Sequence, residues 1–300
     1  MHGLSTSHII TVVAAALKED APWGDVTSAT LIPADALMTA RLVARESGVF
    51  CGGEVFATAM GLASRGGSPL TVSLFAGDAE RFEAGDLLAE VSGSARAILL
   101  AERVALNFVQ RMSAIATLTA AYVAAVAGTR ARIVDTRKTT PGLRQLERYA
   151  VRCGGGQNHR FSLSDALLAK DNHLAVLAAA GLDLAGALTA ARLALPHTTH
   201  LEVEVDRLDQ VESVVAAGID TVMFDNFKLT ELRAGVILVA GRARVEASGG
   251  VSLETVGAIA DTGVDLISVG ALTHSVRALD LGLDFSLDFS VDAESGTAGQ

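Results

Sequence analysis

Basic side chains follow two predicted strands in the second half of the chain. Arg137 and Lys138 come just after an apolar run that contains Ile133, and Lys170 follows the apolar segment 166–169. Guanidinium and ammonium groups bind carboxylates and phosphates through charge-assisted hydrogen bonds. Thr136 precedes Arg137 and adds a hydroxyl group. This placement predicts a site for a small anionic molecule.

Charge is distributed unevenly around these residues. Residues 130–170 contain nine Lys/Arg and three Asp/Glu, a balance of +6, whereas residues 171–225 contain nine Asp/Glu and two Arg, a balance of −7. The whole chain has a net charge of −10, which disfavours a protein that coats nucleic acid. We expect Arg144, Arg148 and Arg152 to be solvated surface charges on a helix.

The segment Arg152–Arg160 (RCGGGQNHR) is unusually rich in glycine. Glycine allows positive φ and close backbone approach, so we interpret Gly154–Gly156 as a cradle whose amides surround an oxygen anion. His159 and Arg160 follow directly as further donors. Cys153 is predicted to be a packed thiol rather than a nucleophile.

Three acids alternate with apolar residues on the next predicted strand. Glu202, Glu204 and Asp206 are expected on one face, and Asp225 ends the following strand. Buried carboxylates need a cation, a metal or hydroxyl groups nearby. Oxygen ligands of this kind suit Mg²⁺ that also contacts substrate phosphates. Salt bridges to Lys138 and Lys170 are the alternative interpretation.

Glycine-containing turns end the last two predicted strands. They comprise Ser248, Gly249 and Gly250, and then Val269, Gly270 and Ala271, with His274 further on. Barrels often bind phosphate in this region through backbone amides and a helix N-terminus. These turns therefore predict a phosphate site.

Short apolar strands alternate with helical segments after residue 130. This alternation indicates parallel βα units, whose polar strand ends gather at one face. Six strands are fewer than the eight of a closed barrel. The predicted fold class is α/β, with an N-terminal α/β (α+β) domain and an open, incomplete parallel α/β barrel. The six strands are Ile133–Asp135, Ala166–Ala169, Leu201–Val205, Thr221–Phe224, Arg244–Ala247 and Leu266–Val269.

The domain boundaries follow from this change of pattern. Residues 1–110 are predicted to form the N-terminal domain, and residues 111–275 the barrel that carries the active site. The segment 276–300 is expected to pack back on the N-terminal domain. We interpret Ala95–Ala127 as two helices. The other N-terminal elements are a helix at His8–Lys18, a capped turn at Asp20–Thr27, and strands at Arg41–Phe50, Leu70–Phe75 and Leu87–Val91.

The sequence gives little sign of export or membrane insertion. Met112–Thr129 is uncharged but contains several polar residues, so we interpret it as a buried helix rather than a membrane span. The N-terminus has no basic region before an apolar run. Two cysteines, Cys51 and Cys153, are too few for a disulfide framework, which favours the cytoplasm.

Taken in order, these motifs resemble the nicotinate-nucleotide pyrophosphorylase (carboxylating) family, also called quinolinate phosphoribosyltransferase. The resemblance covers about residues 8 to 285. Ala169 and Phe224 depart from the family pattern without removing a charged residue. The matching segments are Gly24–Thr27, Glu102–Asn107, Thr136–Arg144, Gly154–Arg160, Lys170–His173, Glu202–Asp206, Asp225–Phe227, Ala247–Val251 and Val269–Ser275.

The resemblance implies an activity. The family makes nicotinate mononucleotide, pyrophosphate and CO₂ from quinolinate and phosphoribosyl pyrophosphate with Mg²⁺, in NAD biosynthesis, and works as a dimer or larger oligomer. It implies that Arg137, His159, Arg160 and Lys170 hold the quinolinate carboxylates, with Thr136 and Lys138 nearby. Arg103 would reach the partner subunit's site.

The same resemblance assigns the remaining residues. Lys138, Lys170, Glu204 and Asp225 would be the catalytic groups. Glu204 and Asp225 would bind the ribose hydroxyls or Mg²⁺, directly or through water. Ser248–Gly250, Val269–Ala271 and His274 would bind phosphate.

Three alternatives remain open at this point. One is a Schiff-base aldolase-type barrel that uses Lys170 as nucleophile. Another is a related phosphoribosyltransferase-like protein of metal-transport operons with a different aromatic acceptor. The third is an anion-binding module without enzymatic activity. Nucleic acid and membranes are not expected as partners.

Overall fold

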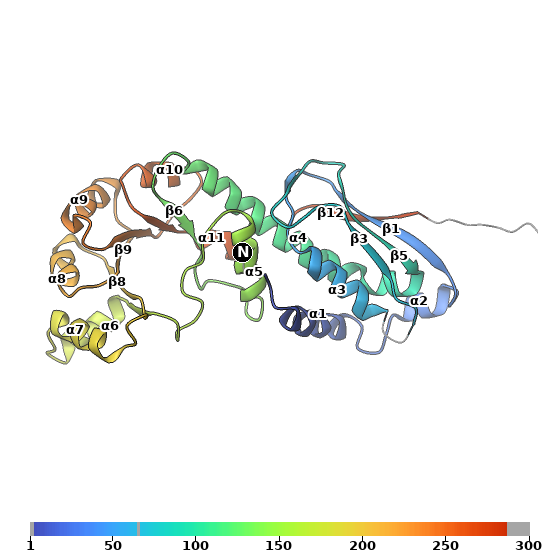
Figure 1. The fold of residues 1–300 in the computed structure, drawn as a ribbon, viewed down its shortest axis with the longest axis horizontal. Helices are drawn as coiled ribbons and strands as arrows, with labels where there is room; N and C mark the ends of the chain where they lie inside the picture. The colour runs from blue at the N-terminus through green and yellow to red at the C-terminus, as the bar shows by residue number, and fades with distance from the viewer. Residues whose placement is uncertain (1–2, 65–66, 287–300) are drawn as a thin grey trace, which may run out of the picture. The chain divides into compact units, whose positions relative to one another are not determined.

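The computed structural model describes residues 3–64 and 67–286, which form two units (Figure 1). Among the described residues, one unit contains Ser5–Gln110 together with the segment 278–286, and the other contains Arg111–Arg277 with Gly3 and Leu4. Helix α4 (Ala95–Ala125) begins in the first unit and ends in the second. The prediction of two helices here was wrong, because no glycine or proline interrupts these 31 residues.

The first unit is built on an antiparallel sheet of four strands in the order β12-β1-β5-β3. Strand β12, from the C-terminal segment, pairs along β1 from Ala44↔Leu281 to Thr39↔Ser286. The rest of that segment, from residue 287, lies outside the described residues. The strands are β1 (Leu37–Ala44), β3 (Thr71–Leu74), β5 (Leu87–Ser94) and β12 (Leu281–Ser286), with a separate antiparallel pair of β2 (Gly48–Val49) and β4 (Arg81–Phe82).

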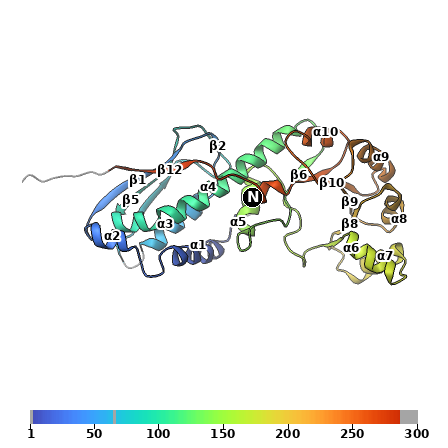
Figure 2. The same cartoon turned by 180° about the vertical axis from the view of Figure 1, so that it is seen from behind.

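The helix predicted at 8–18 and the strands predicted at 70–75 and 87–91 are confirmed, whereas the helices at 26–31 and 53–63 were not predicted. Helix α1 (Thr6–Asp20) contains the predicted helix, and α2 (Val26–Leu31) begins after Asp25, whose carboxylate accepts the Ser28 amide. Helices α1 and α3 (Gly53–Ala63) pack together (Figure 2). The single strand expected at 41–50 is divided, because the chain bends at 45–46 between β1 and β2.

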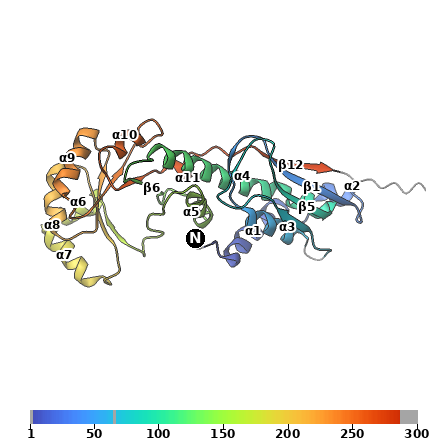
Figure 3. The ribbon, with the colours of Figure 1, turned by 45° about the horizontal axis from the view of Figure 1, so that its top comes forward.

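The second unit is a parallel α/β sheet. Its six strands have the order β6-β11-β10-β9-β8-β7, so within the described chain the first and last strands do not pair and the barrel stays open. Helices α8, α9 and α10 lie along its outer side (Figure 3). The strands are β6 (Arg132–Val134), β7 (Leu167–Ala169), β8 (Leu201–Val205), β9 (Thr221–Asp225), β10 (Arg244–Ser248) and β11 (Leu266–Ser268), close to the six predicted segments.

Helices alternate with these strands along the chain. They are α5 (Arg144–Cys153), α6 (Asp171–Ala179), α7 (Leu184–Ala194), the 3₁₀ helix η1 (Leu208–Gln210), α8 (Val211–Ala216), α9 (Leu229–Val239), α10 (Val256–Ala260) and the short α11 (Ala271–His274). Each β-strand therefore delivers its carboxyl end, and the residues that follow it, to one face.

One close approach involves Phe224, which departs from the family pattern. The buried Phe224 ring on β9 lies against Gly235 of α9, where a Cβ atom would come 2.5 Å from the ring. Any side chain at Gly235 would therefore push the helix away from the strand. The absence of a side chain there gives the larger Phe224 its room.

No single described helix is long and apolar enough to cross a membrane. Helices α6 and α7 reach the necessary length and composition only as a pair, and they are bent by 112° at the break between them.

Candidate active site at the carboxyl ends of the barrel strands

The predicted site residues follow or end successive parallel strands. Lys138 comes after β6, Lys170 immediately follows β7, and Glu204 lies in β8. Asp225 and Ser248 are the last residues of β9 and β10. Because the strands are parallel, these side chains reach the same edge of the sheet.

A cavity of about 360 Å³ lies at this edge. Nine of the predicted site residues line it, together with apolar side chains and with Glu246, which the sequence analysis did not single out. The lining comprises Thr136, Arg137, Lys138, His159, Arg160, Leu168, Lys170, Glu204, Met223, Asp225, Glu246, Ser248 and Ser268. Cations and carboxylates thus line one cavity.

Two arginines of the cavity have buried hydrogen-bond donors without a partner in residues 3–64 and 67–286. The Nε atoms of Arg137 and Arg160 are buried and have no partner within the described part of the chain. One terminal nitrogen of Arg160 donates to the Ala166 carbonyl at 2.9 Å, which fixes the guanidinium. Burial, followed by the nearby charge of Arg137, lowers the pKa of Arg160. Such paired, partly unsatisfied cations suit a ligand with carboxylates.

Lysine and carboxylate meet between β7 and β8. The Lys170 ammonium pairs with the Glu204 carboxylate. Lys170 also caps α6, where its amide donates to His173 Nδ1 at 3.0 Å. The expected salt bridge of Lys170 is therefore present, and it is to Glu204.

The acids of β8 do not all behave as predicted. Glu202 and Glu204 are buried on the interior face of the sheet, but Asp206 is exposed beyond the strand end and pairs with Arg207 at 3.4 Å. The strand ends at Val205, so the alternation no longer applies to Asp206. Asp225 is half-buried and accepts a hydrogen bond from Asn226 at 2.8 Å.

The glycine-rich segment is not an anion cradle, so that interpretation was wrong. The amides of Gly154, Gly155 and Gly156 donate to carbonyls in the last turn of α5, at 3.0 to 3.1 Å. A Cβ atom at Gly154 would lie 2.3 Å from the Ala116 carbonyl oxygen of α4. These glycines end one helix and let it approach another.

A buried ion pair positions the loop that carries His159 and Arg160. Arg148 is 6% exposed and donates to the carbonyl of Arg160 at 2.9 Å and to that of His159. It lies 3.4 Å from the fully buried Asp135, which accepts the His159 amide at 2.8 Å. Burial raises the pKa of Asp135, although Arg148 opposes this shift. Arg148 is thus not the solvated charge that the helix pattern predicted.

A second buried carboxylate holds the loop after β6. Glu147, 1% exposed, accepts from Arg111 Nε at 2.8 Å and from the Thr140 amide at 3.0 Å. Thr273 donates to the Lys138 carbonyl at 2.7 Å. These contacts fix the backbone around Lys138. Sequence reasoning missed them, because the only related signal was the run of charged residues on α5.

The glycine turns lie near the rim of the cavity. Gly249 has φ +89°, and a Cβ atom there would lie 2.2 Å from Asn226 Oδ1. At Gly270, a Cβ atom would lie 3.0 Å from His274 Nε2 and 3.1 Å from Lys138 Cδ. The positive φ and the contact with Asn226 therefore select glycine at 249, whereas a side chain at 270 would require the Lys138 and His274 side chains to shift.

The remaining predicted residues lie outside the cavity lining. Val269, the residue after β11, is buried. Gly250 and His274 are exposed, and Ala271 begins α11. Arg103 is exposed on α4 in the other unit. Cys153 is buried, as predicted.

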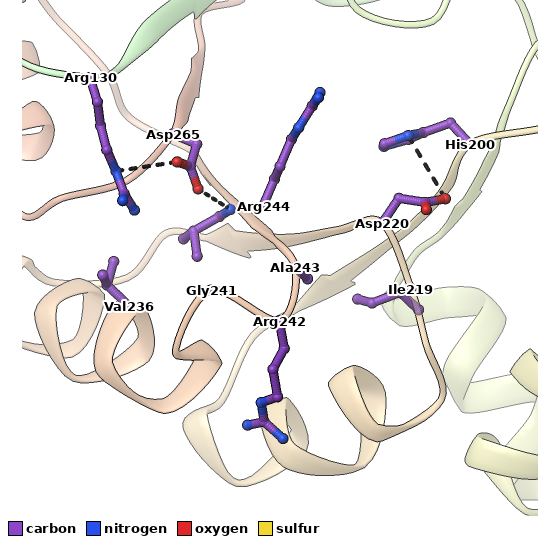
Figure 4. Close-up of a pocket in the computed structure, with 11 residues that line it drawn as sticks. Arg130, His200, Ile219, Asp220, Val236, Gly241, Arg242, Ala243, Arg244 and Asp265 are labelled. Atoms are coloured by element: carbon purple, nitrogen blue, oxygen red, sulfur yellow. Dashed lines mark hydrogen bonds and ion pairs between the residues drawn. The ribbon is translucent and has the colours of Figure 1, made fainter.

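A larger cavity, of about 580 Å³, lies at the opposite, amino ends of the strands (Figure 4). Its charged groups are largely engaged by the protein itself. Arg130 pairs with Asp265 at 3.2 Å, and Asp265 accepts the Val245 amide at 2.8 Å. Size alone therefore does not mark the site.

Comparisons with known proteins identify the family of the chain. The family models of the N-terminal and C-terminal domains of quinolinate phosphoribosyl transferase match residues 25–113 and 115–284. The nicotinate-nucleotide pyrophosphorylase [carboxylating] of Mycobacterium leprae is 44% identical over 272 residues, which cover 89% of this chain and 94% of that protein. A probable enzyme of the same name from Bacillus subtilis is 40% identical, covering 88% and 89%.

Solved structures lead to the same family. NadC from Streptococcus pyogenes superposes with a TM-score of 0.88 at 39% identity, covering 95% of this chain and 99% of that one. The nicotinate-nucleotide pyrophosphorylase from Francisella tularensis gives 0.87 at 36% identity, covering 95% and 98%. The chain therefore belongs to the quinolinate phosphoribosyl transferase family.

Proposed function

We propose that the protein transfers the phosphoribosyl group of phosphoribosyl pyrophosphate to quinolinate and releases pyrophosphate and CO₂, giving nicotinate mononucleotide for NAD biosynthesis. The observation that carries this proposal is the cavity in which Arg137, Arg160, Lys138 and Lys170 converge at one strand edge. Both substrates are polyanions, so a dense cationic site suits them.

The chemistry needs positioning and charge rather than a covalent intermediate. The pyridine nitrogen forms a bond to the anomeric carbon of the ribose while the bond from that carbon to pyrophosphate breaks. Positive charge develops on the sugar and negative charge on the leaving group. Lys138 and Lys170 would stabilise the departing pyrophosphate, and Glu204 and Asp225 the ribosyl cation.

Decarboxylation would follow on the ribosylated ring. The ring nitrogen is then cationic and accepts the electron pair released when the carbon–carbon bond to the adjacent carboxylate breaks. CO₂ leaves, and a proton from solvent replaces it on the ring carbon. Arg137 and Arg160 would hold the second carboxylate, which remains in the product.

The donor set fits Mg²⁺ at Asp225. This carboxylate is half-buried at the cavity and shares only one oxygen with Asn226, whereas Glu204 is already paired with Lys170. Asp225 would hold the ion, directly or through water, together with the substrate phosphates, and Glu204 would contribute from nearby. When bound, the ion would neutralise the charge of pyrophosphate. Chelation should abolish turnover, and added Mg²⁺ should restore it.

We also propose a dimer in the cytoplasm, in which Arg103 serves the site of the partner subunit. The exposed position of Arg103 supports this proposal. Mixing inactive Arg103→Ala with inactive Lys170→Ala subunits should then restore some activity. If mixed dimers form and stay inactive, Arg103 does not act across an interface.

The decisive assay measures CO₂ and pyrophosphate release with both substrates. Equimolar release that requires quinolinate is the expected result. Turnover with nicotinate but not quinolinate would favour a relative with another acceptor. Borohydride trapping of a substrate on Lys170 would favour an aldolase-type reaction. Binding of phosphoribosyl pyrophosphate without release of pyrophosphate would leave an anion-binding module.

A further inference from the structure

Two buried carboxyl groups lie inside the barrel, and one of them, that of Glu246, belongs to the lining of the cationic cavity. Glu246 on β10 is 1% exposed and Glu202 on β8 is 3% exposed. Both approach the imidazole of His159, whose Nε2 lies 3.1 Å from Glu202 Oε2 and 3.6 Å from Glu246 Oε1. The Oε1 atoms of both glutamates have no hydrogen-bond partner in the described structure.

Two adjacent buried carboxylates cannot both remain charged at low cost. Unpaired burial disfavours the ionised form, and a like charge nearby disfavours it further. A single proton shared between the two groups removes one charge and gives the unpartnered oxygens a donor. A second proton is not required, because Glu202 already accepts from His159.

The imidazole shows where the remaining proton lies. The Arg160 amide donates to His159 Nδ1 at 2.8 Å, so Nδ1 is an acceptor and Nε2 carries the hydrogen. Nε2 then donates to Glu202. Burial lowers the pKa of His159, whereas the hydrogen bond to Glu202 and the charge of Glu246 raise it, with a net rise. Protonation of Glu246 removes one of these charges and agrees with the neutral ring that the Arg160 amide requires.

The same tautomer argues against a metal ion among these three residues. Their donor atoms lie within 4.8 Å of one another, which is close enough to share an ion. A histidine that binds a metal through Nε2 normally donates from Nδ1 to a second group. Here Nδ1 accepts instead, so Nε2 is occupied by its hydrogen.

We propose that Glu246 is a neutral carboxylic acid that donates a hydrogen bond to Glu202. It thereby acts as a positioning residue for His159 and Arg160, at the part of the cavity where quinolinate would bind. The inference rests on the proposed function for the identity of the acceptor. Glu202 and His159 are the charged groups that act most strongly on Glu246, Ser268 from β11 lies beside it, and Arg160 and Arg244 line the same interior cavity. Burial and the charge of Glu202 raise the pKa of Glu246 to about 8.

The neutral acid has a consequence for binding. An ionised Glu246 would place a second negative charge beside Glu202, in the lining of a cavity that must accept a dicarboxylate. It would also draw His159 toward the imidazolium form and break the contact between Nδ1 and the Arg160 amide. A neutral Glu246 therefore keeps Arg160 in place for the ligand.

Kinetics of Glu246→Gln and Glu246→Leu test this role. Glutamine is neutral and keeps a donor, so its KM for quinolinate should stay within about threefold of the wild-type value. Leucine is neutral without a donor and leaves Glu202 unsatisfied, so KM should rise about tenfold or more, with a smaller change in kcat. Equal losses in both variants, or no loss in Glu246→Leu, would overturn the proposal.

A second measurement does not depend on turnover. The infrared spectrum of the wild-type protein at neutral pH should contain the carbonyl band of a protonated carboxyl group that disappears in Glu246→Gln. This comparison holds even if Glu246→Leu fails to fold. Absence of the band, or one equivalent of tightly bound divalent metal that Glu246→Gln loses, would contradict the assignment. If the wild-type protein does not use quinolinate, the proposed function fails while the infrared result still decides the state of Glu246.

Discussion

The charged residues at the two ends of the parallel sheet differ in how fully they are paired within the protein. At the amino ends, Asp220 and Asp265 accept the amides of Leu201 and Val245 at 2.7 and 2.8 Å, and each carboxylate also pairs with an arginine. At the carboxyl ends, the Nε atoms of Arg137 and Arg160 remain without a partner among the described residues.

This difference distinguishes charged groups that stabilise the fold from charged groups that can bind a ligand. A charge that already has backbone and ion-pair partners gains little from a bound molecule. A buried donor without a partner inside the protein is costly, so an anion that accepts a hydrogen bond from it offsets that cost. By this criterion the smaller cavity, at the carboxyl ends, is the ligand site. A choice based on cavity size alone would select the larger cavity at the amino ends.

The largest expected effect comes from a fully paired arginine at the carboxyl ends of the strands. Arg148 belongs to the functional end but is saturated, with Asp135 and two loop carbonyls as partners. Removing it leaves a buried carboxylate unpaired, so Arg148→Ala should lower the free energy of unfolding by about 3–5 kcal/mol. Denaturant unfolding measures this change.

Arg152→Ala on the same helix is the matched control for that variant. Arg152 stacks over the Tyr149 ring at 5.4 Å but holds no buried carboxylate, so its loss should be much smaller. Equal destabilisation by the two substitutions would show that the Asp135 pair does not support the loop.

Arg160 should show the opposite behaviour. Its buried Nε has no partner in the described part of the protein, so Arg160→Ala should affect ligand use more than folding. Charge-assisted hydrogen bonds contribute about 1.5–3 kcal/mol each, which corresponds to a loss in kcat/KM for quinolinate of about tenfold to several hundredfold. Steady-state kinetics with varied quinolinate measures it.

The control for Arg160 is an arginine at the other end of the same sheet. Arg242 is exposed just before β10, pairs with Glu212 and lies on the amino-end cavity (Figure 4). Arg242→Ala should leave kcat/KM for quinolinate close to the wild-type value. If Arg242→Ala and Arg160→Ala reduce it equally, the two ends do not differ in function.

The sequence was sufficient for the strands and for most of the cavity lining. Apolar runs that end in polar residues mark the carboxyl ends of parallel strands, and parallel pairing then brings those ends together. This reasoning placed Lys138, Lys170, Glu204 and Asp225 at one site, and all four line one cavity. It needs only the parallel arrangement of the strands, which the alternation of strands and helices along the chain indicates.

Partners from distant parts of the chain were beyond that reasoning. The pattern of α5 does not show that Arg148 meets Asp135, which lies across the loop from it, because helical spacing cannot tell a buried charge from a solvated one. Three consecutive glycines fit a cradle as well as a helix end, and only the carbonyl of Ala116 on α4 decides between them. Glu246 was missed because it occupies one interior position of a strand whose neighbours are apolar.

The smallest expected effect concerns Asp220 at the amino ends. Burial would raise the pKa of Asp220, but the hydrogen bonds from Arg192 and from the Leu201 amide outweigh it and leave the pKa below its usual 3.8. The native state therefore favours the ionised form. This contribution to stability is present above pH 3.8 and is lost as the pH falls through the lower folded-state pKa.

Asp220→Asn keeps an acceptor for the Leu201 amide and removes only the charge. Because the Asp220 side chain is 38% exposed, the loss at neutral pH should be no more than about 1 kcal/mol, with unchanged kcat/KM for quinolinate. The stability difference between wild type and variant, followed by urea unfolding, should shrink as the pH is lowered below 3.8, since the wild type then loses the same charge. A difference that stays constant with pH would mean that Asp220 contributes through shape and not through its charge, and the contrast between the two ends would then rest on Asp265 alone.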